Sequence, residues 1–398
     1  MLSENSQPTP AIRAPVPLHP FRQFIVKLHS RCNLACDYCY VYSMADQRWR
    51  TRPRSMDDRV VKQTAARIGE HARRYQLNSI DVILHGGEPL LAGPTVIAQA
   101  VRDIRAAASA DTTVRVTVQT NGTGLDTRFL RLFADLDIRV SVSLDGDQTA
   151  HDRHRRFADG RGSHASVSQA LRWLTQSPHR SLFNGLLCTV DLRADPIASY
   201  AALIAFAPPM IDFLLPHGNW TAPPPGRPPD RTATPYADWL IAIFDRWYSS
   251  PLREVRVRLF EEIMHVLLGG SSRLEGVGLS PVAFVVIETD GAIESADILG
   301  STYDGAAATG LHVAHNPLDA ALTLPAIRAR QSGAAGLSEG CRRCTLHRSC
   351  GGGLYAHRYR KGSGFDNASV YCADLYRLIT YIKDVLKRDI AQLRTTHQ

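Results

Sequence analysis

Three cysteines stand within eight residues near the start of the chain, in the stretch HSRCNLACDYCYVY (residues 29–42). Cys32, Cys36 and Cys39 are separated by three and then by two residues. Iron–sulfur clusters usually take four thiolates, so three thiolates at this spacing can ligate three irons of a [4Fe–4S] cluster and leave the fourth open. A zinc site or unrelated thiols are the alternatives, because CxxxCxxC also occurs by chance.

Three more motifs follow in order, each at the end of an apolar run. They are HGGEP (residues 85–89), QTNG (119–122) and SLDG (143–146), the last followed by HDRHR. Glycine allows the backbone to approach a ligand closely, and the polar residues beside it can bind polar groups. Each polar residue by itself could be an ordinary strand-end cap. Four motifs at four successive strand ends make a shared ligand site the better explanation.

With these motifs the sequence resembles the radical S-adenosylmethionine (SAM) superfamily. The resemblance implies that the open iron binds the amino and carboxylate groups of SAM. The reduced cluster then cleaves SAM to methionine and a 5′-deoxyadenosyl radical. Glu88 is expected to accept hydrogen bonds from the SAM ammonium, and Tyr38 to pack near adenine. The full set of SAM contacts that the resemblance implies is Tyr38, Gly86, Gly87, Glu88, Pro89, Asn121, Ser143 and Arg155.

A second group of cysteines lies near the C-terminus. Cys341, Cys344 and Cys350 occupy the stretch CRRCTLHRSC, and Cys372 follows 22 residues after Cys350. Four cysteines that include a CxxC pair would satisfy a structural zinc site. In a chain with the motifs above, the pattern instead resembles the SPASM extension, which holds auxiliary [4Fe–4S] clusters. The resemblance implies that these four cysteines fully ligate the distal auxiliary cluster.

Two departures from the SPASM pattern concern the proximal auxiliary cluster. Leu354 occupies the position four residues after Cys350, where that family has a cysteine. Ala296 stands five residues after Gly291, at the family's hairpin cysteine. Losing both ligands together predicts one auxiliary cluster, and two clusters in total. Cys188 is alone inside an apolar run and is interpreted as a buried small residue.

Longer stretches resemble the FxsB-type cyclophane-forming peptide maturases. The shared stretches are KLHSRCNLACDYCYVY, LLPHGNW, IETDG and CGGGLYAHRY…GFDNASVYCADL. This resemblance implies a precursor peptide as substrate, and a carbon–carbon crosslink between an aromatic ring and the β-carbon of a residue two positions on. Such a reaction needs an electron acceptor, which the auxiliary cluster can be, and a proton acceptor near the ring. The first cluster needs an external electron donor of the flavodoxin or ferredoxin type.

Two residues are candidates for the proton acceptor. Asp297 directly follows the lost hairpin cysteine, where the related sulfatase maturases carry their catalytic Asp. His217 lies at the end of an apolar run, beside Asn219 and Trp220. Either residue could instead be a hydrogen-bonded structural residue, and the choice between the two bases stays open.

The elements that must position these residues alternate along the chain. Six apolar, β-branched runs read as strands over residues 22–29, 79–85, 113–119, 138–144, 183–191 and 210–216. Helical segments separate them; in residues 57–75 an apolar stripe repeats every three to four residues, with Ser55 and Asp58 as a cap. Strands alternating with helices predict a parallel α/β sheet, open or curled into a partial barrel, with its chemistry at the carboxyl ends of the strands. The resemblance favours a partial (β/α)6 TIM-like barrel with a C-terminal SPASM-like domain.

The later part of the chain does not continue this alternation of strands and helices. A Pro/Gly-rich stretch follows residue 216, then a helix over residues 235–250, a hairpin turning at Asp290-Gly291, and a terminal helix over residues 373–394. We therefore expect a flexible tail (1–20), a radical SAM core (21–235), linker helices (236–280) and a SPASM-like domain (281–398).

Composition restricts the partners. The 398 residues are 44% hydrophobic and 21% charged, and the net charge of +8 is spread without a dense basic run. No cluster of basic and stacking aromatic residues indicates a nucleic-acid groove. No apolar stretch approaches the roughly 20 residues of a membrane span, and no signal peptide is evident, so we expect a cytoplasmic protein.

Two other functions compete with crosslinking. An anaerobic sulfatase maturase would oxidise Ser or Cys to formylglycine and would share the role of Asp297, but normally carries both auxiliary clusters. A non-catalytic Fe–S protein for electron transfer or redox sensing is the third hypothesis. The SAM-contacting motifs at the strand ends argue against it.

Overall fold

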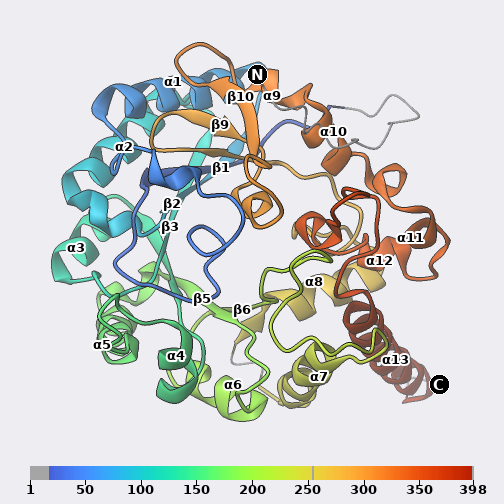
Figure 1. Ribbon diagram of the computed structural model, residues 1–398. Coiled ribbons are helices and arrows are strands. Elements are labelled where there is room, and N and C mark those ends of the chain that lie inside the picture. Colours follow the sequence, from blue (N-terminus) through green and yellow to red (C-terminus); the bar gives the residue numbers. More distant parts are fainter. Residues whose placement is uncertain (1–17, 253–254, 397–398) are drawn as a thin grey trace.

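The computed structural model of the protein describes residues 18–252 and 255–396, and most of the expected N-terminal tail lies outside them. In this part of the chain ten strands form one sheet, in the order β10-β9-β8-β1-β2-β3-β4-β5-β6-β7 (Figure 1). The strands are β1 (Gln23–His29), β2 (Ser79–Gly86), β3 (Thr113–Thr120), β4 (Ile138–Ser143), β5 (Phe183–Thr189), β6 (Met210–Leu214), β7 (Arg256–Val257), β8 (Phe284–Ile287), β9 (Ala292–Glu294) and β10 (Ala308–His312).

Strands β1 to β7 pair in parallel, each with the next. The helices that connect them lie around the outside of the sheet (Figure 1). This confirms the expected parallel α/β sheet, and the six predicted strands match β1 to β6 closely. The helices are α1 (Asp58–Arg74), α2 (Gly93–Ala107), α3 (Thr127–Asp135), α4 (Gln148–His154), α5 (His164–Thr175), α6 (Pro196–Ile204), α7 (Pro235–Tyr248), α8 (Arg258–Leu267), α9 (Asp319–Leu322), α10 (Pro325–Gln331), α11 (Glu339–Arg343), α12 (His347–Cys350) and α13 (Cys372–Thr396).

The core forms between the sheet and these helices. Strand β2 alternates half-buried and buried residues, with Ile80, Val82 and Leu84 fully buried. The predicted stripe of α1 is buried as well. Its predicted cap was wrong, because the side chain of Asp57, not Ser55, accepts the hydrogen bond from the Val60 N–H. Cys188 lies in the apolar core at 1% exposure, as its interpretation required.

The C-terminal hairpin is part of the same sheet. Strand β8 runs parallel to β1, with Val26 opposite Ile287, and β8 then pairs antiparallel with β9. The turn contains Gly291 at a φ of +91°, a conformation that favours glycine. The hairpin therefore places residues 288–297 against the first strand of the core. The domain boundary expected at residue 281 therefore falls between strands that belong to one continuous sheet.

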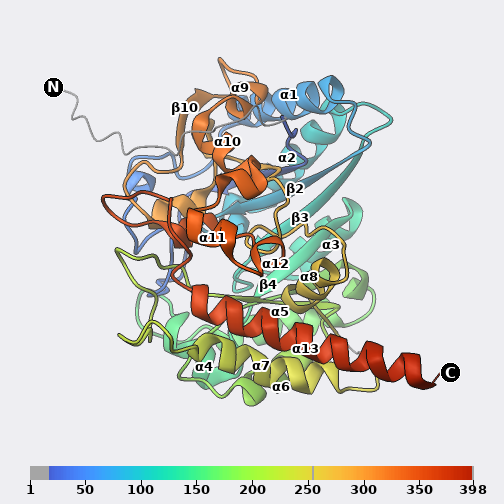
Figure 2. The same cartoon turned by 90° about the vertical axis from the view of Figure 1, so that its right-hand side faces the viewer.

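The terminal helix α13 packs along α7 and α8 (Figure 2). Asp374 in its first turn accepts hydrogen bonds from the Tyr236 and Ala237 backbone N–H groups, at 2.9 and 3.0 Å. These are unpaired donors at the start of α7, so one helix caps another. None of the helices in the described residues is long and apolar enough to cross a membrane.

We predict that Gly86→Ala lowers the free energy of unfolding by about 2–4 kcal/mol. Gly86 has a φ of +147°, and a Cβ there would lie 2.1 Å from the His29 carbonyl oxygen. Anaerobic urea unfolding measures the change. Gly340→Ala is the matched control, because a Cβ there meets nothing within 4 Å. Equal losses in the two variants would contradict the steric argument.

Candidate active site

The loop between β1 and α1 carries the first three cysteines. Burial raises the pKa of the Cys32 thiol to about 12 and that of Cys36 to about 11, and the negative charges of neighbouring cysteines add to both effects. The three thiols therefore lie close enough to influence one another electrostatically. The Leu34 N–H and the Asn121 amide donate to the Cys32 sulfur at 3.4 and 3.5 Å. Because metal ligation requires thiolates, these donors suit a cysteine that binds iron.

Glu88 connects the carboxyl ends of two strands through hydrogen bonds. Its carboxylate accepts hydrogen bonds from the Leu90 N–H (3.0 Å), the Thr120 hydroxyl (2.7 Å) and the Asn121 N–H (2.7 Å). The side chain is buried, and burial raises its pKa. A carboxylate has about four acceptor positions, so one remains for a ligand. The expected contact with the SAM ammonium stays a prediction.

The glycines before Glu88 are required sterically. A Cβ on Gly87 would lie 1.8 Å from the Tyr42 hydroxyl oxygen. Pro89 follows as the first residue of a short 3₁₀ helix and is buried. The GGEP segment thus lies directly beneath the cysteine loop.

A third polar group joins the cysteine loop to the region after β4. The Tyr38 hydroxyl donates to Asp145, and the Arg155 guanidinium donates to the Tyr38 hydroxyl at 2.9 Å. Arg155 is half-buried, and its Nε, which is buried, has no hydrogen-bond partner among the described residues. An unpaired buried guanidinium N–H is a good site for a carboxylate, which fits the carboxylate of SAM.

Asp145 was not among the predicted residues, although it lies in the SLDG motif. It accepts a hydrogen bond from the Thr189 N–H at 2.9 Å in addition to that from Tyr38. Ser143, which was predicted, accepts a hydrogen bond from the Gln119 amide at 3.2 Å. The Asn121 amide also contacts Asn33 at 2.9 Å. The predicted SAM residues thus occupy neighbouring strand ends beside the cysteine loop.

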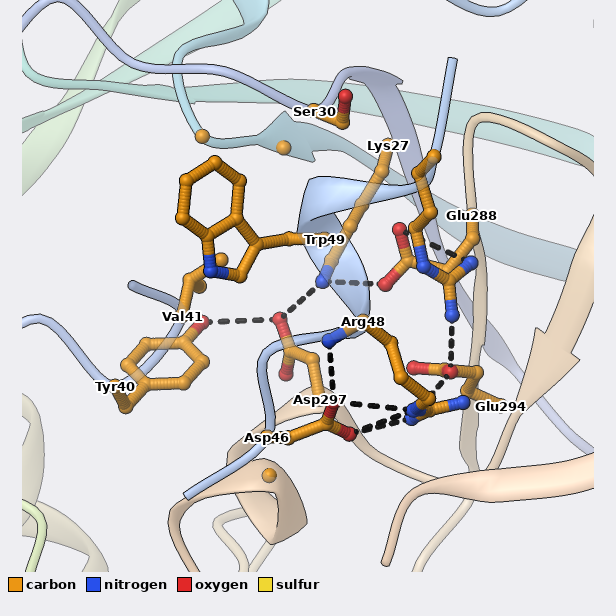
Figure 3. Close-up of a pocket in the computed structure, with 14 residues that line it drawn as sticks. Lys27, Ser30, Tyr40, Val41, Asp46, Arg48, Trp49, Glu288, Glu294 and Asp297 are labelled. Atoms are coloured by element: carbon orange, nitrogen blue, oxygen red, sulfur yellow. Dashed lines mark hydrogen bonds and ion pairs between the residues drawn. The ribbon is translucent and has the colours of Figure 1, made fainter. Parts of the chain in front are cut away.

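An open pocket of about 450 Å³ lies beside the cysteine loop, and buried charges line it (Figure 3). Lys27 of β1 has its Nζ 2.7 Å from Glu288 and 3.4 Å from Asp297. The Tyr40 hydroxyl donates to Asp297 from the other side, at 3.0 Å. Figure 3 shows Asp297 between the Lys27 ammonium and the Tyr40 ring.

The charges around Asp297 set its protonation. Burial alone would raise its pKa, but the positive charge of Lys27, together with the interaction with His85 and the Tyr40 hydrogen bond, lowers it below the ordinary value. The carboxylates of Glu288, Asp297 and Glu294 raise the pKa of Lys27 in spite of its burial. Asp297 is therefore a carboxylate at neutral pH.

The rest of the pocket wall is a second ionic network. Arg52 bonds to Glu294 at 2.5 Å, and Arg48 reaches the same carboxylate at 2.9 Å. Arg48 also pairs with Asp46 at 2.6 Å. Sequence reasoning missed Lys27 and these residues. The signal available was a lone lysine inside the apolar run of β1.

His217 and Asp297 both contact Tyr40. Its ring lies 4.9 Å from the Tyr40 ring and 5.6 Å from the His357 ring, centroid to centroid. The residue is half-buried, and its Nδ1, which is buried, has no partner among the described residues. Burial lowers its pKa to about 4, so the ring is neutral at neutral pH. The structure thus brings both candidate bases to one tyrosine.

The second set of cysteines comes together where α11, α12 and α13 meet. Burial raises the pKa of Cys350 to about 11, and the charges of Cys372 and Cys341 raise it further. Burial also raises the pKa of Cys372, and the charges of Cys341 and Cys344 add to this rise. All four are free thiols. No group of three or more His, Cys, Asp or Glu side chains in the described residues could hold a single metal ion. A cluster differs, because each thiolate binds a separate iron.

An ion pair occupies the region of the two lost cluster ligands. Arg330 binds Glu275 through two N–H groups at 3.1 and 2.9 Å, and donates to the Ser295 carbonyl, next to Ala296, at 2.9 Å. A Cβ on Gly276 would lie 3.0 Å from the Leu354 nitrogen, so the chain carrying Glu275 contacts Leu354 as well. Ala296 packs in a small apolar cluster with Tyr355 and Ala356.

Comparison with known proteins agrees with this geometry. Residues 26–188 match the family model of the Radical SAM superfamily. The chain is 26% identical to a serine-type anaerobic sulfatase-maturating enzyme of Klebsiella pneumoniae over 399 residues, covering 96% of this chain and 92% of the relative. It is 23% identical to a cysteine-type enzyme of Clostridium perfringens over 383 residues, covering 91% and 96%.

Solved structures share the fold. The anaerobic sulfatase-maturating enzyme anSMEcpe with bound AdoMet and a Cp18Cys peptide superposes with a TM-score of 0.78 at 20% identity, covering 93% of this chain and 99% of that one. SuiB of Streptococcus suis bound to its precursor peptide SuiA gives 0.57 at 12% identity, covering 90% and 76%. The chain therefore has the radical SAM α/β fold, and residues 26–188 are the part that matches the family model.

The lowered pKa of His217 predicts a pH dependence of stability. Because its folded pKa of about 4 lies below the unfolded value of 6.5, the unfolded state binds more protons between these values. Stability is therefore complete above pH 6.5 and falls toward pH 4, by up to about 1.4 kcal/mol per pH unit. We expect His217→Leu to reduce this slope, measured by anaerobic urea unfolding. His315→Leu, at an exposed position, is the control, and identical slopes in both variants would contradict the assignment.

Proposed function

We propose that the chain is a radical SAM enzyme that forms a carbon–carbon crosslink in a ribosomally made precursor peptide. The bond joins an aromatic ring to the β-carbon of a nearby residue. The observation that carries this proposal is Asp297, a buried carboxylate beside the cysteine loop and open to a pocket, held deprotonated by Lys27 and hydrogen-bonded to Tyr40. It supplies the proton acceptor that the reaction requires.

The residues near the pocket fit the cofactors. Cys32, Cys36 and Cys39 would hold a [4Fe–4S] cluster with one open iron, and the unpaired Nε of Arg155 suits the carboxylate of SAM. Cys341, Cys344, Cys350 and Cys372 would hold one auxiliary [4Fe–4S] cluster. Bound together, SAM and the first cluster supply a 5′-deoxyadenosyl radical, and the auxiliary cluster supplies a one-electron acceptor.

The balance of the reaction assigns a role to the chain's own residues. Joining the β-carbon to the ring removes two hydrogen atoms from the peptide. One leaves the β-carbon as an atom, and the other leaves the ring as a proton and an electron. Asp297 would accept that proton, directly or through the Tyr40 hydroxyl at 3.0 Å. His217, neutral and in contact with Tyr40, is the second candidate.

The arrangement around Ala296 and Leu354 supports a single auxiliary cluster. The Arg330–Glu275 pair and the apolar cluster around Ala296 lie where the SPASM resemblance implies the proximal cluster. The motifs CGGGLYAHRY and IETDG support the crosslinking reaction in particular.

A second candidate is formylglycine formation. Similarity to sulfatase-maturating enzymes along nearly the whole chain favours it. That reaction also abstracts a β-hydrogen and requires a proton acceptor, so Asp297 would keep its role. A non-catalytic Fe–S protein would not bind SAM, and a SAM-binding measurement on the purified protein separates it from both enzymes.

Coexpression with short peptides encoded beside the gene tests the proposal. A crosslinked peptide and a formylglycine made from Ser both lack two hydrogen atoms relative to the precursor. Only the aldehyde reacts with a hydrazide, and only the crosslink suppresses fragmentation between the joined residues in tandem mass spectrometry. We expect an unreactive peptide with a fragmentation gap. A hydrazide-reactive product would establish the second candidate instead.

Asp297→Asn tests the proposed base. Hydrogen abstraction precedes proton loss, so 5′-deoxyadenosine should still form, while modified peptide per deoxyadenosine should fall by about 100-fold. Cluster content and SAM affinity are measured first. Asp46→Asn is the control. It removes another carboxylate that lines the pocket, but Asp46 pairs with Arg48 and not with Tyr40. If Asp297→Asn keeps the wild-type ratio of product to deoxyadenosine, Asp297 is a structural residue only.

A further inference from the structure

Arg358 is a buried arginine between the third and fourth cysteines of the second set. It ends the 3₁₀ helix Tyr355–Arg358, and 8% of the residue is exposed. Its guanidinium donates to the carbonyl oxygens of Gly351 (2.5 Å), Gly352 (3.1 Å) and Gly353 (3.0 Å). These three residues directly follow Cys350, so the guanidinium is fixed against the loop that carries this ligand.

Among residues 18–252 and 255–396, no acidic side chain forms a hydrogen bond or ion pair with Arg358. In the part of the chain that the structure describes, its hydrogen bonds all go to backbone carbonyls, and no carboxylate lies within ion-pair distance of it. Glu275, the carboxylate that influences it, is bound through both oxygens by Arg330. Arg330 and Arg358 are thus two buried guanidinium groups with the single carboxylate of Glu275 near them. This leaves one net positive charge.

Cys341 and Cys350 influence Arg358 electrostatically, and their thiols supply opposite charge when they are deprotonated. Tyr355 contacts it as a ring, with the guanidinium carbon 5.5 Å from the ring centroid. A buried charge without a counter-charge is costly. When the four thiols are deprotonated to hold a cluster, this cost is offset, because the ligated site is anionic.

We propose that Arg358 is the counter-charge of the auxiliary cluster and raises its reduction potential. Four thiolates outweigh the charge of the iron–sulfur core, and one further electron makes the site more negative. A fixed positive charge next to the ligands therefore stabilises the reduced state more than the oxidised state. The inference rests on the proposed function, in which this cluster accepts the electron from the peptide, and it identifies the residue that makes the site a better acceptor.

The test uses the full chain with Cys32, Cys36 and Cys39 replaced by Ala, so that one cluster remains. After anaerobic reconstitution, iron analysis should give about four irons per chain, and a redox titration followed by electron paramagnetic resonance gives the potential. Arg358→Gln removes the charge, whereas Arg358→Lys keeps it, and both disturb the bonds to the glycine loop. We expect Arg358→Gln to reduce the equilibrium constant for reduction at least tenfold, which is a fall of about 59 mV for one electron.

Arg358→Lys should stay near the parent potential. Arg343→Gln is the matched control for charge: this arginine lies between Cys341 and Cys344 in sequence, but 75% of its side chain is exposed and it pairs with Glu339. Solvent and salt screen such a charge, so we expect no measurable change. An unchanged potential in Arg358→Gln, or equal falls in the Gln and Lys variants, would overturn the proposal.

A further variant keeps the proposal testable if Arg358→Gln does not retain its cluster. Glu275→Gln leaves Arg330 without its carboxylate and adds one net positive charge to the same buried region. We expect the potential to rise, and an unchanged or lower potential would overturn the electrostatic role. If the parent itself binds no iron, the auxiliary cluster of the proposed function is wrong, and the inference fails with it.

Discussion

The ion pair of Lys27 with Glu288 and Asp297 is the interaction on which the site depends. It joins the first strand of the sheet to the C-terminal hairpin, two segments about 260 residues apart. Three charges buried together are stable only in good mutual geometry, because removal of one leaves the others uncompensated. The parallel pairing of β1 with β8 supplies that geometry, since it fixes the separation of Lys27 from the hairpin.

From this pair the buried polar groups extend in one direction, toward the second set of cysteines. Tyr40 bonds to Asp297 and contacts His217, whose ring contacts that of His357. The His357 ring lies 4.9 Å from the ring of Tyr371, the residue directly before Cys372. The two histidines are neutral because burial lowers their pKa values. A continuous row of uncharged rings thus separates the carboxylate pocket from the cysteines.

The sequence predicted the strands well because each of β1 to β6 is a short apolar, β-branched run between polar segments. It also identified residues that meet at the strand ends, since carboxyl ends of parallel strands share an edge. Local capping was less certain: Ser55 and Asp57 are both good caps, and only the backbone conformation selects Asp57. The pairing of β8 with β1, and with it the partner of Lys27, depends on contacts between distant segments that no local pattern encodes.

The buried charges differ in sign between the two ends of this row of rings. Asp46, Glu288, Glu294 and Asp297 line the pocket together with Lys27, Arg48 and Arg52, an excess of one carboxylate. Near the second set of cysteines, Arg330 and Arg358 share Glu275, an excess of one guanidinium. At the pocket end, Lys27 keeps Asp297 deprotonated and so able to accept a proton. At the other end, a positive environment favours taking up an electron. In the proposed reaction the proton and the electron leave the same ring, and the opposite charges at the two ends would draw them apart.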